Sequence, residues 1–316
     1  MIHFSLDQKT KKLATVLGLI AIFIWAIEVV IVSELNEVPL FEALFIIFSS
    51  SFLFTAARIT YRKNWVKYKN HSYKIWFIGI LGVCGSDAAY MYAALKAPII
   101  HVDLIDYIWP CLATLFVSFL PNEKFSFKNI FACFLGLIGI MILFYDGNLT
   151  NKYYDTFLEG YFFAFFGAFI WAVYIAFSRS KKKVPSEMVG LYCGIGAVLA
   201  FISHIYCETF VYPSNFELIL CIVMGFAGGG LAYQLWDLGI KFGNLPLLNT
   251  STYFARVLAM LFMSYLEKSV ITPTLILSTA ITILAVFLST LDVSQNKSLI
   301  YLKKVFLKIK EKSSRM

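Results

Sequence analysis

Charged residues are scarce in this sequence of 316 residues. Only 15% of the chain is Asp, Glu, Lys or Arg, whereas 59% is hydrophobic and the mean hydropathy is +0.75. Soluble domains carry about 25% charged residues, so this composition excludes an ordinary soluble domain. Long apolar runs with few charges are typical of membrane-spanning helices. We therefore predict an integral membrane protein.

Motifs of several chemical classes are also missing. The six cysteines show neither zinc-ligand spacing nor a disulfide framework, and all fall in or beside apolar runs, so we expect small buried hydrophobic residues. No H-E-x-x-H, G-x-S-x-G or phosphate-binding loop motif occurs. We therefore predict no metal site, no cofactor, no catalytic residue and no ATP-driven pump. His101 and Asp106 match the H-x4-D spacing of some acyltransferases, which keeps a membrane enzyme as a distant alternative.

Apolar segments of about 20 residues, each long enough to span a bilayer, fill most of the chain. Backbone groups inside lipid must pair internally, so we expect helices rather than strands. The first segment is followed by no cleavage pattern of a signal peptide, and we expect it to be the first helix of the mature protein. The predicted fold is all-α, with ten transmembrane helices near 13–33, 38–57, 75–95, 101–120, 128–145, 158–178, 188–207, 217–239, 246–266 and 271–291.

The basic residues give an expected orientation. With a cytoplasmic N-terminus, 23 of the 27 Lys and Arg lie on the cytoplasmic side, and only Lys96, Lys152 and Lys268 lie outside. This bias predicts that both termini are cytoplasmic. It also explains the net charge of +8 without a nucleic-acid partner. The basic tail, 292–316, is expected either to lie as a helix on the anionic inner leaflet or to be solvated.

A short repeat divides the chain. The tetrapeptide FIWA occurs at 23–26 and again at 169–172, and the same offset of 146 relates Tyr107 to Tyr253. We interpret this as an internal duplication with five spans in each half. An odd number of spans turns the second half upside down, and inverted repeats are typical of alternating-access transporters with a site near the midplane. The expected divisions are 1–12, 13–145, an outer loop 146–157, 158–291 and 292–316.

The second half contains AYQLWDLGIKFGNLPLLNTSTYF (232–254), which resembles the signature of the EamA-type drug/metabolite transporter superfamily. The bacterial aromatic amino acid exporters are the most similar branch. Where that branch has approximately Asn-Tyr-Leu-Trp-Pro, this sequence has DYIWP (106–110). The resemblance implies two EamA repeats in a bacterial inner membrane, around a central cavity lined by spans 1, 3, 4, 6, 8 and 9. Two departures add charge, because Asp106 replaces Asn and Arg256 replaces a proline.

Ionisable residues within spans are costly, so each is a functional candidate. Glu42 and Asp103 fall near outer ends of spans and are expected to be hydrated, and Asp237 is expected to be a solvated cap near an inner end. The deeper candidates are Glu28, Asp87, Asp106 and Arg256.

Arg256 is the most informative of these residues. Its guanidinium cannot lose its proton and must be paired or face water. Two interpretations stay open: an internal ion pair with Asp106 or Asp87, or a site for a substrate carboxylate. Asp87 could bind a substrate ammonium or carry a coupling proton. Glu28 shares a helical face with Trp25, three residues earlier.

Aromatic residues make up 17% of the chain, and most are expected in packing, lipid contact or interface anchoring. Some fall in the spans that the family uses for its cavity, where rings suit a flat or cationic ligand. These candidates are Trp25, Tyr90, Tyr107, Trp109, Trp171, Tyr174, Trp236 and Tyr253. Gly228, Gly229 and Gly230 loosen span 8, which favours either close packing or a hinge.

Together these features predict a secondary active or facilitative transporter for amino acids or amino-acid-like metabolites, working by alternating access. The alternative is a transporter of a cationic nucleoside-type metabolite such as S-adenosylmethionine. The expected partners are a small-molecule substrate, the lipid bilayer and a possible coupling proton. A monomer and a homodimer both stay open.

Overall fold

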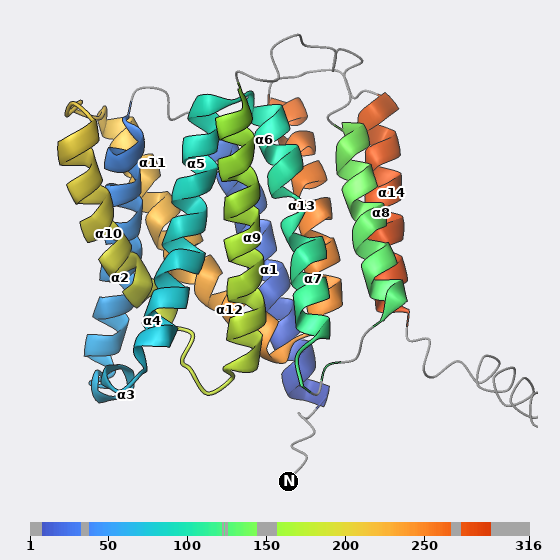
Figure 1. Cartoon of the computed structure of the whole chain (residues 1–316), viewed down its shortest axis with the longest axis horizontal. Helices are drawn as coiled ribbons and strands as arrows, with labels where there is room; N and C mark the ends of the chain where they lie inside the picture. The colour runs from blue at the N-terminus through green and yellow to red at the C-terminus, as the bar shows by residue number, and fades with distance from the viewer. Residues whose placement is uncertain are drawn as a thin grey trace, which may run out of the picture.

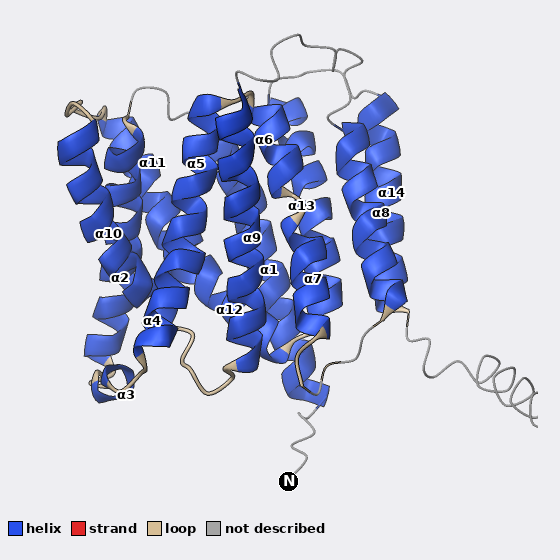
Figure 2. Ribbon diagram, viewed as in Figure 1, coloured by secondary structure: helices blue, strands red, loops and turns tan. Residues whose placement is uncertain are grey.

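The computed structural model describes residues 8–32, 38–121, 123, 126–143, 157–266 and 273–291. Within these ranges the chain is helical, with short connections and no strand (Figure 2). The expected tail 292–316 and nearly all of the expected loop 146–157 lie outside the described residues.

The first half of the chain forms the helices on which the first set of candidate residues lies. In order, they are α1 (Gln8–Val32), α2 (Leu40–Tyr61), the short α3 (Val66–Lys69), α4 (Tyr73–Ile80), the π-helical η1 (Leu81–Gly85), α5 (Ser86–Lys96), α6 (Ile99–Asp106), α7 (Trp109–Ser118) and α8 (Phe127–Leu143).

The second half repeats this order. Its elements are α9 (Leu158–Ser180), α10 (Met188–Cys207), α11 (Asn215–Met224), the π-helical η3 (Gly225–Ala232), α12 (Tyr233–Phe242), α13 (Leu245–Leu266) and α14 (Pro273–Thr290). In each half a π-helical segment joins two α-helices into one continuous rod, α4–η1–α5 and α11–η3–α12.

Several of these helices have the length and apolarity of a membrane span. In the described part of the chain seven segments qualify: Gln8–Glu28, Leu40–Tyr61, Tyr73–Lys96, Leu158–Ser180, Met188–Cys207, Asn215–Phe242 and Pro273–Thr290. Phe127–Ile142 is a shorter apolar helix. The prediction of an all-helical, multi-span membrane protein is therefore confirmed.

The two halves run in opposite directions. Figure 1 shows α1 rising from the lower end of the bundle, whereas its counterpart α9 descends from the upper end. The contacts between helices follow the same symmetry, because α1 packs on α12 as α9 packs on α5, and α2 packs on α10. The two π-helical segments also occupy equivalent positions, since an offset of 146 places 81–85 inside 225–232.

A proline explains why α6 and α7 are two separate helices. Pro110 lies in the first turn of α7 and has no N–H to donate to the carbonyl four residues earlier, so α6 ends at Asp106. Tyr107 and Ile108 form the break. This break lies in the segment that resembles the EamA motif, which places the motif's aromatic side chains at a helix end rather than in a regular helix.

The outer surface of the bundle is apolar. On α9, four phenylalanines at helical spacing are exposed, whereas Trp171 and Tyr174 on the same helix are buried. Lipid is the favourable surrounding for such a face. The exposed phenylalanines are Phe162, Phe165, Phe166 and Phe169. The expectation of buried cysteines is confirmed for all but Cys207, which is exposed.

Gly190 and Gly194 of α10 pack within the chain. A Cβ atom at Gly190 would collide with Thr55 of α2, and one at Gly194 would meet Phe52 of the same helix. Small residues at this spacing allow close helix approach.

Candidate substrate-binding site

Six aromatic side chains meet in the interior of the bundle. Trp236 of α12 is fully buried and lies against Trp25 of α1, with ring centroids 5.4 Å apart, and against Trp109 of α7 at 5.9 Å. Trp171 of α9 lies 6.3 Å from Trp109 and 5.5 Å from Tyr233 of α12. Tyr174 stacks on Trp171 at 5.4 Å. We call these residues the aromatic cluster: Trp25, Trp109, Trp171, Tyr174, Tyr233 and Trp236.

The aromatic cluster joins both repeats. Trp25 and Trp109 come from the first half, and the other four members come from the second. Five of the six are residues that the sequence singled out. Tyr233 was missed, although the offset of 146 could have found it. It lies 146 positions after Asp87 and is therefore the counterpart of Asp87 in the second repeat.

The Tyr233 hydroxyl donates a 2.6 Å hydrogen bond to the Asp87 carboxylate on α5. Asp87 and Tyr233 are therefore counterparts that meet each other across the repeat symmetry. This bond fixes a carboxylate at the edge of the aromatic cluster. It also ties α5 of the first half to α12 of the second.

The indole N–H of Trp236 is a buried donor. Within the described part of the chain no protein atom accepts a hydrogen bond from it. Buried polar groups nearly always have a partner, and Trp N–H groups usually find one. A ligand that brought an acceptor atom into the aromatic cluster would satisfy this donor.

Glu28 packs against the π-helical segment η3. A Cβ atom at Gly228 would collide with the Glu28 carboxylate. The equivalent contact in the other half is between Gly82 of η1 and Tyr174, the counterpart of Glu28. The side chain that contacts the π-helical glycine is thus a carboxylate in one half and an aromatic ring in the other. Asp87 is an electrostatic neighbour of Glu28, so two acids share this region.

Arg256 of α13 forms an ion pair with Asp103 of α6. Asp103 is 2% exposed and also accepts a 2.6 Å hydrogen bond from the Tyr90 hydroxyl. The Arg256 guanidinium lies 5.8 Å from the centre of the Tyr107 ring, in cation–π contact. Two expectations are corrected here: Asp103 is not hydrated, and the internal partner of Arg256 is neither Asp106 nor Asp87.

The symmetry explains where this ion pair comes from. Asn249 is the counterpart of Asp103, and Pro110 is the counterpart of Arg256. In the structure the Asn249 amide donates to the Pro110 carbonyl at 3.4 Å. The same pair of equivalent positions is thus in contact on both sides of the repeat symmetry. One contact is the Asp103–Arg256 ion pair, and the other is the neutral hydrogen bond from Asn249 to Pro110. The offset alone would not have found Asp103 as the partner of Arg256, because the equivalent contact of Asn249 with Pro110 is itself known only from the structure.

Asp106 is the last residue of α6 and lies beside the pair formed by Tyr107 and Tyr253. It is partly buried and is an electrostatic neighbour of Asp87. Tyr107 and its counterpart Tyr253 lie with ring centroids 6.1 Å apart. The Tyr253 hydroxyl is fully buried and lies 3.2 Å from the Cys111 sulfur. Asp106 therefore extends the acidic region of Glu28 and Asp87 toward the tyrosine pair.

The three acids lack a basic partner. Among the described residues no Lys, Arg or His nitrogen lies within 4.0 Å of Glu28, Asp87 or Asp106. Among the described residues, Asp103 and Asp237 are thus compensated by Arg256 and Lys241, whereas Glu28, Asp87 and Asp106 have no cation beside them. A cationic ligand group would be favoured beside them.

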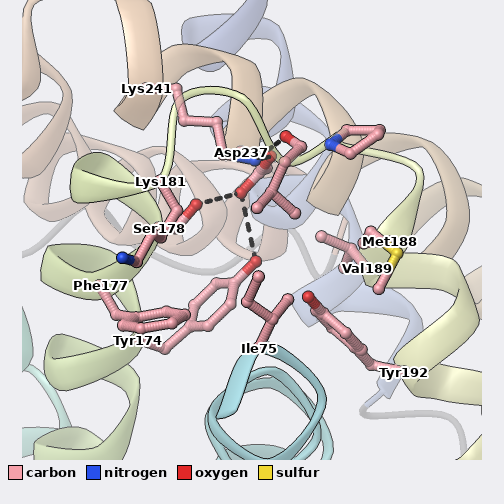
Figure 3. Close-up of a pocket in the computed structure, with 12 residues that line it drawn as sticks. Ile75, Tyr174, Phe177, Ser178, Lys181, Met188, Val189, Tyr192, Asp237 and Lys241 are labelled. Atoms are coloured by element: carbon pink, nitrogen blue, oxygen red, sulfur yellow. Dashed lines mark hydrogen bonds and ion pairs between the residues drawn. The ribbon is translucent and has the colours of Figure 1, made fainter. Parts of the chain in front are cut away.

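Asp237 of α12 lies in a second polar cluster, which it forms with side chains of α9 (Figure 3). It is 1% exposed, pairs with Lys241, and accepts hydrogen bonds from Ser178 at 2.5 Å and Tyr174 at 3.2 Å. The expectation of a solvated cap is wrong, because the i, i+4 lysine and two hydroxyls replace water. The adjoining cavity measures about 10 Å³, room for about one water molecule.

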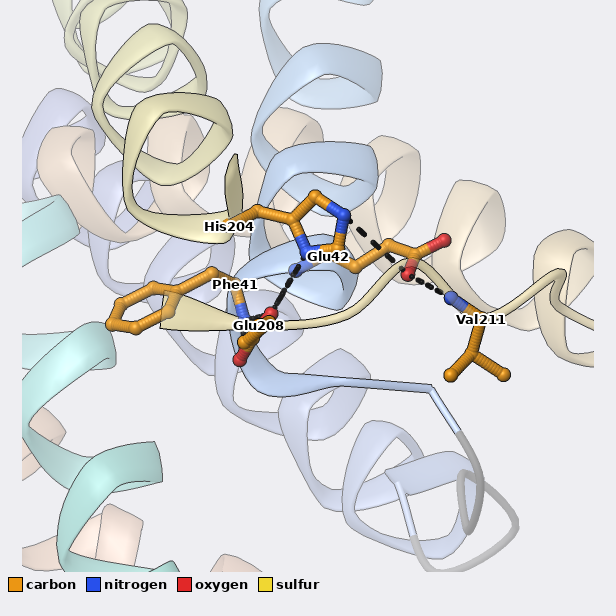
Figure 4. Close-up of polar contacts among 5 residues, drawn as sticks. All are labelled: Phe41, Glu42, His204, Glu208 and Val211. Atoms are coloured by element: carbon orange, nitrogen blue, oxygen red, sulfur yellow. Dashed lines mark hydrogen bonds and ion pairs between the residues drawn. The ribbon is translucent and has the colours of Figure 1, made fainter. Parts of the chain in front are cut away.

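Glu42 is also buried, in a cluster where the first turn of α2 meets the last turn of α10 (Figure 4). It accepts a hydrogen bond from the Val211 backbone N–H at 3.3 Å and lies 3.9 Å from His204. His204 is hydrogen bonded to Glu208 at 2.9 Å. The expectation of a hydrated Glu42 is therefore wrong, and its role is to tie α2 to the segment that follows α10.

The three glycines of span 8 lie in η3. Gly228 touches Glu28, a Cβ atom at Gly229 would lie 3.1 Å from the Ser51 Cβ, and one at Gly230 would lie 2.8 Å from Phe54. Close packing against α1 and α2 thus requires small residues here. π-Helical segments are frequent at functional sites, and the hinge stays a prediction.

His101 does not face Asp106 as a catalytic pair would. Its Nδ1 atom lies 2.6 Å from the Tyr161 hydroxyl of α9. The described residues include no group of three or more His, Cys, Asp or Glu placed to hold a metal ion.

Inverted helical repeats around an interior with aromatic and ionisable side chains are typical of membrane transporters. The sequence profile of the EamA-like transporter family matches residues 12–145 and 158–291. The chain belongs to the EamA-like transporter family, and each of its halves is one EamA repeat.

Similar proteins agree with this assignment. An aromatic amino acid exporter YddG from Ancylobacter novellus is 30% identical over 254 residues, which cover 80% of this chain and 88% of that protein. The aromatic amino acid exporter YddG of Escherichia coli K12 is 26% identical over 267 residues, covering 79% and 87%. A crystal structure with 29% identity superposes with a TM-score of 0.82 over 88% of this chain and 96% of that one.

Proposed function

We propose that this transporter moves aromatic amino acids across the bacterial inner membrane by alternating access. The observation that carries the proposal is the aromatic cluster, which joins both repeats and has carboxylates at its edge. The names of the relatives from Ancylobacter novellus and Escherichia coli support the same substrate class and favour export. Neither the family nor these relatives favours S-adenosylmethionine or an acyltransferase.

In the proposed site the aromatic cluster holds the substrate ring by stacking and edge contacts. Asp87 and Asp106, with Glu28 nearby, hold the ammonium group. Arg256 holds the carboxylate, for which it must exchange Asp103 for the substrate. Tyr90, Tyr107 and Tyr253 line the region between Arg256 and the acids, where their rings bound the substrate's polar end.

The proposed topology has ten spans in two domains, 13–145 and 158–291, with both termini cytoplasmic. The seven described spans supply part of this arrangement, and α6–α7, α8 and α13 supply the other three. Lys and Arg support the orientation, because Arg58, Arg179 and Lys241 lie in the last turns of α2, α9 and α12, and these helices end at the lower end of the bundle in Figure 1.

Alternating access in this proposal is a rocking of the two halves about the midplane, with η1 and η3 as the paired places where the rods bend. Gly228, Gly229 and Gly230 supply the flexibility in the second half. Proton coupling through Asp87 remains a prediction.

Transport by purified protein in proteoliposomes tests the proposal. The panel contains tryptophan, phenylalanine, threonine, lysine and S-adenosylmethionine, each with and without a pH gradient. Uptake of tryptophan and phenylalanine, with little uptake of threonine, is the expected result. Transport confined to lysine or S-adenosylmethionine would overturn the proposal. Equal dependence on the gradient for Asp87→Asn and the unsubstituted protein would remove Asp87 as the proton carrier.

A further inference from the structure

Among the described residues, acidic side chains outnumber basic side chains in the interior of the bundle. Arg256 already has Asp103 as its ion-pair partner, and Lys241 has Asp237. Glu28, Asp87 and Asp106 lie in the same interior, and no basic side chain among the described residues lies within 4.0 Å of them. A cationic ligand group would therefore find acidic partners here that no basic side chain of the described residues occupies.

The surroundings of these acids suit a small organic cation. Asp87 is held by the Tyr233 hydroxyl, which belongs to the aromatic cluster, and Glu28 is one helical turn from Trp25. Ring faces attract ammonium groups, most strongly where water is excluded. An ammonium group beside Asp87 would contact both a carboxylate and the rings of Trp25 and Tyr233, which pack at 5.4 Å from each other.

A substrate carboxylate would bind in this interior less favourably than an ammonium group. To bind Arg256 it must displace Asp103, which is buried and, among the described residues, accepts one further side-chain hydrogen bond, from the Tyr90 hydroxyl. Displacement leaves a buried carboxylate without its cation, and that loss offsets the new contact. The neutral contact of Asn249 with Pro110 at the equivalent place indicates that the Arg256–Asp103 pair serves first to join α13 to α6.

We infer that the site selects its ligands by the ammonium group and the aromatic ring, and that the carboxylate is dispensable. Decarboxylated aromatic amines, such as 2-phenylethylamine, tyramine and tryptamine, are therefore ligands and transported substrates of this protein. This inference rests on the proposed function, because it concerns the same site and the same rings.

Binding to the full-length protein in detergent tests the inference. Trp25, Trp109, Trp171 and Trp236 lie in the aromatic cluster, so tryptophan fluorescence reports a ligand there. Three ligands differ in one group each: phenylalanine, 2-phenylethylamine without the carboxylate, and 3-phenylpropanoate without the ammonium. We expect 2-phenylethylamine to bind within about tenfold of phenylalanine, and 3-phenylpropanoate about 100-fold more weakly. Uptake of labelled 2-phenylethylamine in proteoliposomes extends the test to transport.

Variants separate the acids from the scaffold. Asp87→Asn and Asp106→Asn should each weaken 2-phenylethylamine binding by about tenfold or more. Glu159→Gln is the matched control, because Glu159 is an exposed carboxylate of α9 that pairs with Lys96 away from the aromatic cluster, and its binding should be unchanged. A thermal melt of each variant confirms that the fold is intact.

The outcomes are distinguishable. Binding and uptake of phenylalanine without binding of 2-phenylethylamine would overturn the inference and leave the proposed function standing. Binding of 3-phenylpropanoate but not 2-phenylethylamine would overturn it too, and would assign the selecting role to Arg256. Failure of phenylalanine and tryptophan, with uptake of 2-phenylethylamine, would reject the proposed function alone. Failure of all aromatic ligands would reject both.

Discussion

At the scale of single residues, the ionisable side chains inside this bundle divide into two kinds. Asp103, Asp237 and Glu42 have protein partners that replace water. Glu28, Asp87 and Asp106 have neighbouring rings and one another, but no cation among the described residues. The first kind joins helices, and the second kind is available to a ligand. The proposed site consists of the second kind.

The Arg256–Asp103 pair gives a prediction about stability. Asp103→Asn removes the carboxylate that pairs with the buried Arg256 guanidinium, and removal of one partner of a buried pair costs about 3–5 kcal/mol. We expect a marked fall in the melting temperature of the purified protein. Adding Arg256→Met to Asp103→Asn removes the guanidinium as well and should recover most of the loss. A double variant as unstable as Asp103→Asn alone would show that the pair is not the cause.

The same pair gives a separate prediction about transport. If Arg256 takes the substrate carboxylate, Arg256→Lys keeps the charge but loses the bidentate geometry, so the apparent affinity for phenylalanine should fall by about tenfold. The affinity for 2-phenylethylamine, which has no carboxylate, should stay unchanged in this variant. Uptake of both ligands, measured on the same proteoliposomes, checks the two results together. Unchanged uptake of phenylalanine would remove the carboxylate role.

At the scale of elements, the π-helical segments η1 and η3 make matched contacts with the first helix of the opposite repeat. Gly82 of η1 meets Tyr174 of α9, and Gly228 of η3 meets Glu28 of α1. A Cβ atom at Gly82 would overlap the Cβ atom of Tyr174, whereas one at Gly228 would overlap the end of the flexible Glu28 side chain, so the requirement for glycine is stricter at Gly82. The rods therefore touch α1 and α9 most closely beside the aromatic cluster.

Gly82→Ala tests this contact. The added methyl group would push Tyr174 out of its stack on Trp171, and overpacking of this kind costs about 1–3 kcal/mol. We expect a lower melting temperature and weaker phenylalanine binding. Gly85→Ala is the matched control in the same segment, because its Cβ atom would meet only the ends of Leu81 and Ile170 at 3.1 and 3.4 Å. Equal effects of both substitutions would contradict the argument.

The upper end of α2 depends on a residue far along the chain. Pro39 provides no side-chain cap, and the Glu208 carboxylate accepts hydrogen bonds from the Phe41 and Glu42 backbone N–H groups instead (Figure 4). Loss of a helix cap costs about 0.5–2 kcal/mol, so Glu208→Ala should lower the melting temperature. Glu159→Gln should not. Equal melting temperatures for Glu208→Ala and the unsubstituted protein would contradict the capping role.

At the scale of the whole molecule, the internal duplication organises both the fold and the site. Counterparts meet each other across the symmetry, as Asp87 does with Tyr233 and Tyr107 with Tyr253. A site built on such an axis is shared by two halves that run in opposite directions, and it can face either side of the membrane when the halves rock. This is the physical basis of the proposed alternating access.

The proposed orientation can be tested with cysteine labelling. In a Cys207→Ser background, which removes the exposed cysteine among the described residues, a membrane-impermeant maleimide should label Lys96→Cys in intact cells. Lys181→Cys should be labelled only after the cells are opened, because basic loops face the cytoplasm. Labelling of Lys181→Cys in intact cells would reverse the proposed topology.

The sequence by itself determined the class of structure. Its low charge and apolar runs predicted a helical membrane protein, because backbone groups in lipid must pair within each helix. The offset of 146 predicted the two repeats, and most of the aromatic cluster followed from the resemblance. These features are local or periodic along the chain, so they can be read without knowledge of contacts.

Only the tertiary structure decided which side chains meet. It paired Arg256 with Asp103 rather than Asp106 or Asp87, and it buried Asp237 and Glu42 where the sequence predicted water. Position along a span gives the depth of a residue but not the direction of its side chain, which depends on how neighbouring helices rotate and pack. The break at Pro110 also shifts α6 relative to α7. The partner of each charged side chain in the bundle was therefore determined by helix packing alone.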